Sequence, residues 1–336
     1  MGSEFKGVLA ALACAASLAA NAAASSYTIV DLTPEGAGHA GAISASGIVA
    51  GCRNTPTATR AFLYENGQRR DLDAPEGSTS CALAVNSQGV AAGRIDGEIT
   101  VWDGPVARRL GAQGNVTGIS DGGVVVGSLI DPATNVGRAF MWANGIFTDL
   151  GIAGTAIGIN HRGQIAILSS DRLLYMYENG SLRNLADASV TNAFGLNDRG
   201  EIVGMTSFGH GAEPFIYDGV VRQIPGAGSY AGAVAINNVG QILGSGEGIY
   251  GYLIEAGQVT TLDSLAGAST GTTAWHHNEG KAINDRGWIV GQAAGESFHA
   301  FLMVPKEAAP AAAVAGNPAQ RKSSRSEPLI RSARNR

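Results

Sequence analysis

The stretch AINDRGWIVG, residues 282–291, places two apolar runs on either side of Asn284, Asp285, Arg286 and Gly287. A hairpin connection of this length needs an Asn, Asp or Ser whose side chain bonds the backbone two residues on, followed by a Gly that takes a positive φ. Asn284 and Gly287 have the spacing for these two roles. The stretch therefore predicts a β-hairpin in which the Asn makes a turn and performs no chemistry.

Six upstream segments share this pattern with the stretch. The seven segments are AISASGIVAG (42–51), AVNSQGVAAG (84–93), GISDGGVVVG (118–127), GINHRGQIAI (158–167), GLNDRGEIVG (195–204), AINNVGQILG (235–244) and AINDRGWIVG (282–291). Their turn glycines recur every 34 to 47 residues. A period of about 40 residues with four strands is typical of a β-propeller blade. We number these repeats 1 to 7 in chain order.

A second hairpin follows the first in repeats 1 to 6. In AFLYENGQRRDL (61–72), for example, an Asn-Gly pair lies between two strand-like runs, and the other repeats use Asn-Gly, Asp-Gly or Ala-Gly. Such pairs favour tight hairpin turns. Each repeat is therefore expected to form four strands, a to d, with tight a–b and c–d turns.

The two ends of the repeat region complete each other. Repeat 7 has HAFLMVP (299–305) as its strand c and lacks a strand d, whereas SYTIVDL (26–32) resembles the end of a repeat. An N-terminal strand that completes the last blade hides the edges of the sheets. The sequence thus predicts an all-β fold, a seven-bladed β-propeller of four-stranded blades, closed by Tyr27 to Leu32 as the outer strand of the last blade.

The segments outside the repeats predict export and a tail. Lys6 precedes an apolar run that ends in small residues, which is typical of a secretory signal peptide over residues 1–24, and residues 1–5 resemble a cloning scar. A lipid anchor on Cys14 is the alternative. Residues 306–336 are rich in Pro, Ala, Ser and Arg and are expected to be disordered. The propeller would then span residues 25–305 of a secreted or periplasmic protein without a membrane span.

Composition and cysteine content narrow the function. The chain of 336 residues has 48 Gly, 45% hydrophobic and 15% charged residues, as expected of a turn-rich globular protein. Its net charge is −5 although the tail is basic, so the acidic body argues against a nucleic-acid partner. Removal of the signal peptide leaves Cys52 and Cys81, for which a disulfide and two free thiols both remain open.

The repeat resembles the HAF repeat of bacterial extracellular proteins. The resemblance lies in AIND-x-G-x-IVG, then His-Ala-Phe at 299–301 or Arg-Ala-Phe at 60–62 and 138–140, then an Asn-Gly turn and Asp-Leu, and it covers about residues 26–304. It implies export and a propeller-like fold, and it implies no agreed activity or catalytic residues. Repeats 2, 4 and 6 depart from the triplet, so a function that needs the triplet in every blade is in doubt.

The variable b–c and d–a loops share one face of a propeller and are expected to carry any site. The segment 275–279, WHHNE, is the densest polar and aromatic cluster. An imidazole titrates near neutral pH, a carboxylate can orient it, and an Arg can neutralise a uronate. The catalytic candidates, if the protein is an enzyme, are His276, His277, Glu279, His210 and Arg53. The ligand-binding candidates are Trp275, Asn278, His299, Tyr230 and Tyr250.

The sequence leaves three functional hypotheses. It contains no nucleophile elbow, phosphate-binding loop, dinucleotide fingerprint or zinc-binding spacing, so no cofactor or metal is predicted. The first hypothesis is a monomeric binding or interaction module that holds an extracellular glycan or protein through its variable-loop face. The second is an extracellular lyase or hydrolase that acts on an acidic polysaccharide, and the third is a structural protein without a pocket.

Overall fold

The computed structural model describes residues 26–306, apart from residues 105, 132, 135, 186–189, 208–210, 228–229, 247–248, 268–275 and 295–296. The chain divides after Pro305 into two parts, and the strands belong to the first part. Except for the helix α1 (Leu262–Ala266), every regular element in the described ranges is a β-strand. Within these ranges, no helix has the length and apolar character that crossing a membrane requires.

The strands follow the repeats. Repeats 1 to 4 contain β2 (Gly38–Ile43), β3 (Val49–Asn54), β4 (Thr59–Glu65), β5 (Gln68–Asp71), β6 (Ser80–Val85), β7 (Ala91–Ile95), β8 (Glu98–Asp103), β9 (Val106–Ile119), β10 (Val125–Ile130), β11 (Gly137–Ala143), β12 (Ile146–Ile159), β13 (Ile165–Ser169), β14 (Leu174–Glu178) and β15 (Ser181–Asn184). Repeats 5 to 7 contain β16 (Asn192–Leu196), β17 (Ile202–Ser207), β18 (Ala212–Tyr217), β19 (Val221–Gln223), β20 (Ala231–Ile236), β21 (Ile242–Gly246), β22 (Ile249–Glu255), β23 (Gln258–Thr261), β24 (His276–Ile283), β25 (Ile289–Ala294) and β26 (Phe298–Pro305).

Antiparallel sheets of four strands form from repeats 1, 5 and 6, in the order a-b-c-d. Repeats 2 to 4 merge into one ten-stranded sheet, because β9 and β12 each serve as strand d of one repeat and strand a of the next. The sequence predicted a loop at these two junctions, and that expectation was wrong. Gly111 and Gly151 lie there with positive φ, which lets the chain turn inward without leaving the strand.

The N-terminal strand completes the sheet of repeat 7. β1 (Tyr27–Asp31) pairs antiparallel with β26, from Tyr27 opposite Pro305 to Asp31 opposite Phe301. The backbone N–H of Ala300 also donates to the Thr33 hydroxyl over 3.0 Å. The sheet order is β1-β26-β25-β24, which is the pairing that the sequence predicted for the two ends of the repeat region.

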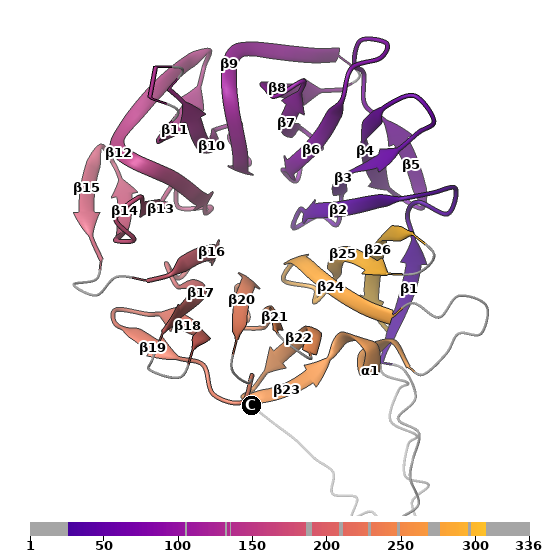
Figure 1. Cartoon of the computed structure of the whole chain (residues 1–336), viewed down its shortest axis with the longest axis vertical. Helices are drawn as coiled ribbons and strands as arrows, with labels where there is room; N and C mark the ends of the chain where they lie inside the picture. Colours follow the sequence, from indigo (N-terminus) through magenta and orange to yellow (C-terminus); the bar gives the residue numbers. More distant parts are fainter. Residues whose placement is uncertain are drawn as a thin grey trace, which may run out of the picture. The chain divides into compact units, whose positions relative to one another are not determined.

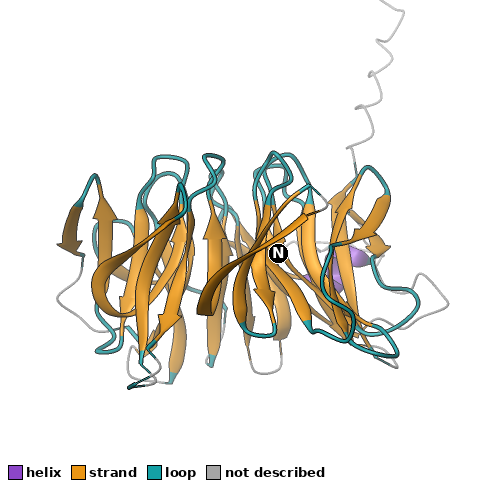
Figure 2. Cartoon of the chain, turned by 90° about the horizontal axis from the view of Figure 1, so that it is seen from above, coloured by secondary structure: helices purple, strands orange, loops and turns teal. Residues whose placement is uncertain are grey.

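The sheets lie around a common centre, with strand a of each repeat innermost (Figure 1). The innermost strands contact each other in the cyclic order β2, β6, β9, β12, β16, β20 and β24, and β24 contacts β2. Seen from the side, the strands run between two faces that carry the turns and loops (Figure 2). We call the face with the a–b and c–d turns the turn face and the opposite face the loop face.

The phenylalanine of the His-Ala-Phe triplet belongs to the core between the sheets. Phe62, Phe140 and Phe301 are fully buried, and each is paired with the last Gly of the hairpin motif on strand b. Phe215 and Tyr252 occupy the same place in repeats 5 and 6. The phenylalanine of the triplet therefore serves the packing of the sheets.

The turn Asn joins neighbouring repeats as well as shaping its own turn. Asn284 is 5% exposed, and its Oδ1 accepts from the N–H groups of Arg286 and Trp288, each over 3.1 Å. Its Nδ2 donates to the carbonyl oxygen of Ser44 in repeat 1 over 3.1 Å. The same cross-repeat bond runs from Asn86 to Ser120, Asn160 to Asn197, Asn197 to Asn237, and Asn237 to Asn284.

Repeats 1 and 3 have Ser44 and Ser120 at this position and use other links to the next repeat. Each Ser still accepts from a turn N–H, but a hydroxyl is too short to reach the neighbouring repeat as the amide does. Repeats 1 and 2 are instead joined by a disulfide between Cys52 and Cys81. Repeats 3 and 4 are joined by the Thr117 hydroxyl, which donates to the carbonyl of Ala156 over 2.6 Å.

Replacement of Asn284 tests both of its roles. Asn284→Ala removes three hydrogen bonds and leaves buried groups unpaired, so we expect the free energy of unfolding to fall by about 2 to 4 kcal/mol. Asn284→Ser copies repeats 1 and 3 and keeps the turn bond, so we expect a loss nearer to 1 kcal/mol. Denaturant unfolding of the two variants provides the measurement. Equal losses in both variants, or a loss below about 0.5 kcal/mol in the Ala variant, would contradict this account.

Candidate functional site

Each innermost strand carries a β-bulge at the same position. In repeat 7, Gly280 faces Gly291 and Ala282 faces Val290, so Lys281 between them has no partner on strand b. A bulge of this kind turns a side chain out of the regular alternation of the strand. The corresponding residues in repeats 1 to 6 are Gly41, Leu83, Thr117, Ile157, Phe194 and Val234. We call these seven positions the bulge residues.

The last Gly of the hairpin motif makes room for the bulge. A Cβ added at Gly291 would overlap the carbonyl oxygen of Glu279 and would contact the ring of Phe301. The same overlap with a strand-a carbonyl occurs at Gly51, Gly93, Gly127 and Gly204. In these five repeats the approach of the two backbones leaves no room for a side chain at the Gly. In repeat 4, Ile167 stands at this position and the bulge is retained.

The bulge residues converge on one cavity. A cavity of about 630 Å³ is lined by six of the seven, namely Gly41, Thr117, Ile157, Phe194, Val234 and Lys281. Its other lining residues include His39, Asn192 and Ser169, which lie at or near the ends of their strands farthest from the a–b turns, and Ser170, which follows β13. The cavity thus lies toward the loop face, and its volume falls within the range of about 300 to 1,000 Å³ that is common for ligand pockets. We call it the central cavity.

The wall of the central cavity is mostly apolar and carries one cation. Phe194 is 39% exposed, and Ile157 and Val234 add aliphatic surface. Among the described lining residues, Lys281 is the one with a formal charge, and its Nζ lies 2.7 Å from Oε1 of Glu279. Burial lowers the pKa of His39, and the charge of Lys281 lowers it further, so His39 is a neutral imidazole near pH 7. These groups suit a ligand with an apolar surface and a negative group.

Two of the predicted site candidates, Arg53 and His299, are engaged by other side chains. Arg53 donates to both oxygens of Asp71, over 2.9 and 2.6 Å, and its guanidinium also lies 3.2 Å from Glu35. His299 lies within 3.2 Å of Asp31 and within 3.0 Å of the Ser297 hydroxyl.

Two further candidates lie apart from the lining of the central cavity. Glu279 lies beside the cavity, where its second carboxylate oxygen accepts from Gln292 over 2.8 Å. Tyr230 is 62% exposed and has a positive φ, and it precedes β20 next to Gly211.

The remaining predicted candidates have no described side chain. His276, His277 and Asn278 form part of β24 and Tyr250 forms part of β22, and only their backbones are described. Trp275 and His210 lie outside the described residues. None of the ten candidates is among the described residues that line the central cavity.

Sequence reasoning missed the bulge residues. A signal for them exists, because the third residue before the turn Asn or Ser varies from Gly to Phe to Lys between repeats, whereas the residues on either side of it are mostly small. Only the strand register shows that this variable residue is unpaired.

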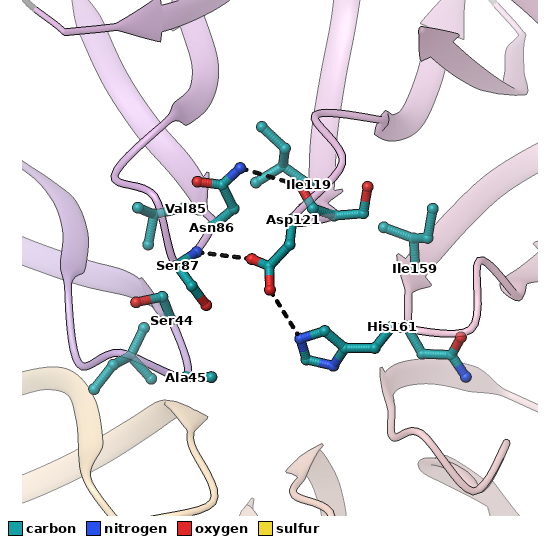
Figure 3. Close-up of a pocket in the computed structure, with 12 residues that line it drawn as sticks. Ser44, Ala45, Val85, Asn86, Ser87, Ile119, Asp121, Ile159 and His161 are labelled. Atoms are coloured by element: carbon teal, nitrogen blue, oxygen red, sulfur yellow. Dashed lines mark hydrogen bonds and ion pairs between the residues drawn. The ribbon is translucent and has the colours of Figure 1, made fainter.

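A smaller pocket of about 160 Å³ lies on the turn face, lined by the a–b turns of repeats 1 to 4 (Figure 3). In this pocket the Nε2 of His161 lies 3.3 Å from Asp121, and its Nδ1 lies 3.0 Å from Asp198. The amide of Asn238 continues the series, donating to Asp198 over 2.7 Å and to Asp285 over 2.9 Å. These side chains link the second turn residues of successive repeats, and we call them the turn-face series.

The carboxylates of the turn-face series favour a protonated His161. Partial burial lowers the pKa of His161, but the hydrogen bond and charge of Asp198 and the charge of Asp121 outweigh it, so the net change is upward. For Asp198, burial raises the pKa, but hydrogen bonds from the His161 backbone and side chain outweigh it and lower the pKa. Both shifts favour the ionic form of the pair.

Comparisons with known proteins identify the fold and no family. No family model and no curated protein matches the sequence. A structure of YCF48 bound to a D1 peptide matches with a TM-score of 0.54 and 11% identity, covering 83% of this chain and 96% of that one. The extracellular domain of BT4673 from B. thetaiotaomicron matches with a TM-score of 0.54 and 13% identity, covering 82% of this chain and 39% of that one.

A third structure, the β-propeller domain of the Trilobed protease from Pyrococcus furiosus, matches with a TM-score of 0.47 and 13% identity, covering 70% of this chain and 84% of that one. At these identities a likeness concerns the fold alone. The structural neighbours are β-propeller domains, and the likeness to the first two supports an all-β, propeller-like fold for this chain.

The His161 ion pairs predict a pH-dependent part of the stability. The pKa of His161 is raised in the folded state. The stability that its ion pairs contribute is therefore complete below the ordinary pKa of about 6.5 and is lost as the pH rises through the raised pKa. The side chain is 54% exposed, so we expect less than about 1 kcal/mol. His161→Gln should destabilise the chain more at about pH 5.5 than at about pH 8.5, as measured by denaturant unfolding. An equal effect at both pH values would contradict the assignment.

Proposed function

We propose that this chain is an exported interaction module, built as a closed seven-bladed β-propeller, that binds a segment of an extracellular protein partner in the central cavity. Three features support the seven-bladed ring: a bulge at the same position of strand a in all seven repeats, the cyclic contacts of the innermost strands, and the pairing of β1 with β26. The convergence of the bulge residues on one cavity is the observation that carries the binding role.

The variation of the bulge residues supports recognition. The turn Asn and the motif Gly recur in most repeats, as structural positions should, whereas the bulge positions hold Gly, Leu, Thr, Ile, Phe, Val and Lys. If the bulge served only the packing of the ring, similar side chains would suit every repeat. A set of different side chains around one cavity instead provides an asymmetric wall, which can distinguish one ligand from another.

The chemistry of the wall favours a protein segment over a sugar. Phe194 and Val234 offer apolar surface, whose burial contributes roughly 25 cal/mol per Å². Lys281 is paired with Glu279, and the remaining N–H donors of its ammonium can form a charge-assisted hydrogen bond with a ligand carboxylate. A chain end or an acidic side chain beside an apolar one combines these features. The peptide named in the YCF48 structure is an instance of a peptide held by a protein with a similar fold.

Export is supported by three observations of different kinds. The first residues of the sequence have the character of a signal peptide. Cys52 and Cys81 form a disulfide, which persists in oxidising compartments. One structural neighbour is an extracellular domain. The resemblance to the HAF repeat points in the same direction.

The lyase or hydrolase hypothesis has less support. It needs an Arg that is free to bind a uronate, whereas Arg53 is held by Asp71 and Glu35. It also needs a base with a free lone pair near that Arg, and Glu279 is engaged by Lys281 and Gln292. The binding role needs neither feature.

Selection of peptides provides the test of this function. A random peptide library displayed on phage is selected against the immobilised full chain, and a glycan array is probed in parallel. We expect enriched peptides with an apolar residue beside a carboxylate. Phe194→Ala and Lys281→Gln should each weaken their binding at least about tenfold, which is about 1.4 kcal/mol. Val239→Ala is the control, because this exposed residue lies on the turn face.

Three results would change the proposal. Enriched peptides that bind both cavity variants as well as the unmodified chain would place the site elsewhere. Binding to the glycan array that the cavity variants abolish would replace the protein partner with a glycan. No binder from either screen would contradict the interaction role.

A further inference from the structure

We call the boundary between neighbouring repeats a seam. Three potential metal ligands lie close together at the seam between repeats 1 and 2. His39 on β2 and Cys52 on β3 are directly opposite in the strand register, so their side chains lie on the same face of the sheet. The Nδ1 of His39 lies 3.2 Å from the Sγ of Cys52. Cys81 on β6 reaches the same point through the disulfide. One ligand atom from each of the three residues lies within 4.8 Å of the others.

We propose that reduction of the Cys52–Cys81 disulfide converts His39, Cys52 and Cys81 into a binding site for a thiophilic divalent metal such as Zn²⁺. A phosphine reductant breaks the S–S bond, takes oxygen from water to become a phosphine oxide, and leaves two thiols. The metal then binds the two thiolates and the imidazole, with release of the two thiol protons. Sulfur and imidazole nitrogen are the ligands that Zn²⁺ prefers, and three protein ligands leave a fourth position open.

In the disulfide-bonded chain, strands of two contacting sheets hold the three ligands in place. Each ligand lies on a different strand of two contacting sheets, and β2, β3 and β6 contact one another. His39 also lines the central cavity, which provides a route for an ion from solvent. A bound metal would therefore need little rearrangement of the backbone.

Replacement of the disulfide by a bound metal would affect the link between repeats 1 and 2. Repeat 1 has Ser44 where most repeats have the Asn that donates to the next repeat, and the disulfide is the covalent link across this seam. A metal bound by Cys52 and Cys81 would restore that link after reduction. This inference is independent of the proposed ligand of the central cavity, because it rests on the seam.

Cobalt binding to the reduced chain tests the proposal. The full chain carries Cys14→Ser, so that Cys52 and Cys81 are its two thiols. It is reduced with a phosphine without oxygen, freed of reductant and titrated with Co²⁺. We expect one Co²⁺ per chain, a thiolate-to-cobalt charge-transfer band in the near ultraviolet, visible bands of tetrahedral cobalt, and loss of all of these when Zn²⁺ is added. The oxidised chain should show none of them.

Variants separate the ligands from the rest of the chain. His39→Ala should weaken Co²⁺ binding at least about tenfold, since even changes beside a ligand cost 10- to 100-fold. Cys81→Ser should remove the stoichiometric complex. His161→Ala is the matched control and should bind Co²⁺ as the unmodified chain does.

Circular dichroism of the reduced chain, recorded first, should show the β-sheet signal of the oxidised chain. Three outcomes would overturn the proposal. They are a reduced chain without the charge-transfer band, a His39→Ala variant with unchanged affinity, and loss of the β-sheet signal on reduction.

Discussion

The bulge in each innermost strand is the constraint on which the rest of the structure depends. It brings a carbonyl of strand a so close to strand b that in five repeats a side chain at the facing Gly would overlap it. The aromatic ring of strand c, such as Phe301, covers the bare Gly and fills the space that a side chain would have taken. In five repeats the same bulge places a side chain on the wall of the central cavity. The bulge thus explains both the packing of the strand-c ring on the strand-b Gly and the position of the candidate site.

The turn Asn is the second structural feature of the fold, and it holds neighbouring repeats in register. Neighbouring sheets in a propeller meet through side chains, so few backbone hydrogen bonds hold them in register. A buried amide that is satisfied both in its own turn and on the next repeat fixes that register at five seams. The two seams that begin with Ser44 and Ser120 have a disulfide and a Thr hydroxyl instead. The seam with the disulfide is also where His39 and the two Cys meet.

Features governed by chemistry within a few residues were predictable from the sequence. The hairpins, their Asn and Gly positions and the pairing of β1 with β26 follow from turn chemistry and from counting strands. The bulges were not predictable in this way, because an extra residue in one strand is defined only against its partner. The second role of Asn284 depends on Ser44, 240 residues away in the sequence. The candidate site was missed for the same reason. The sequence analysis favoured polar residues that it placed in loops, such as Arg53, which lies in β3, whereas Phe194 and Val234 have the character of ordinary strand residues.

Cysteine labelling along one innermost strand tests the central claim, that the bulge aims a variable side chain into a shared cavity. In the Cys14→Ser chain, single cysteines replace Ala193, which is 3% exposed, and Phe194, which is 39% exposed, and their reaction with a small thiol reagent is timed. The account predicts that position 194 reacts at least about tenfold faster than position 193. It also predicts that a bulky label at position 194 slows the reaction of a second cysteine at Val234, which lines the cavity from the neighbouring strand β20. Equal rates at positions 193 and 194, or no effect of the label on position 234, would contradict it.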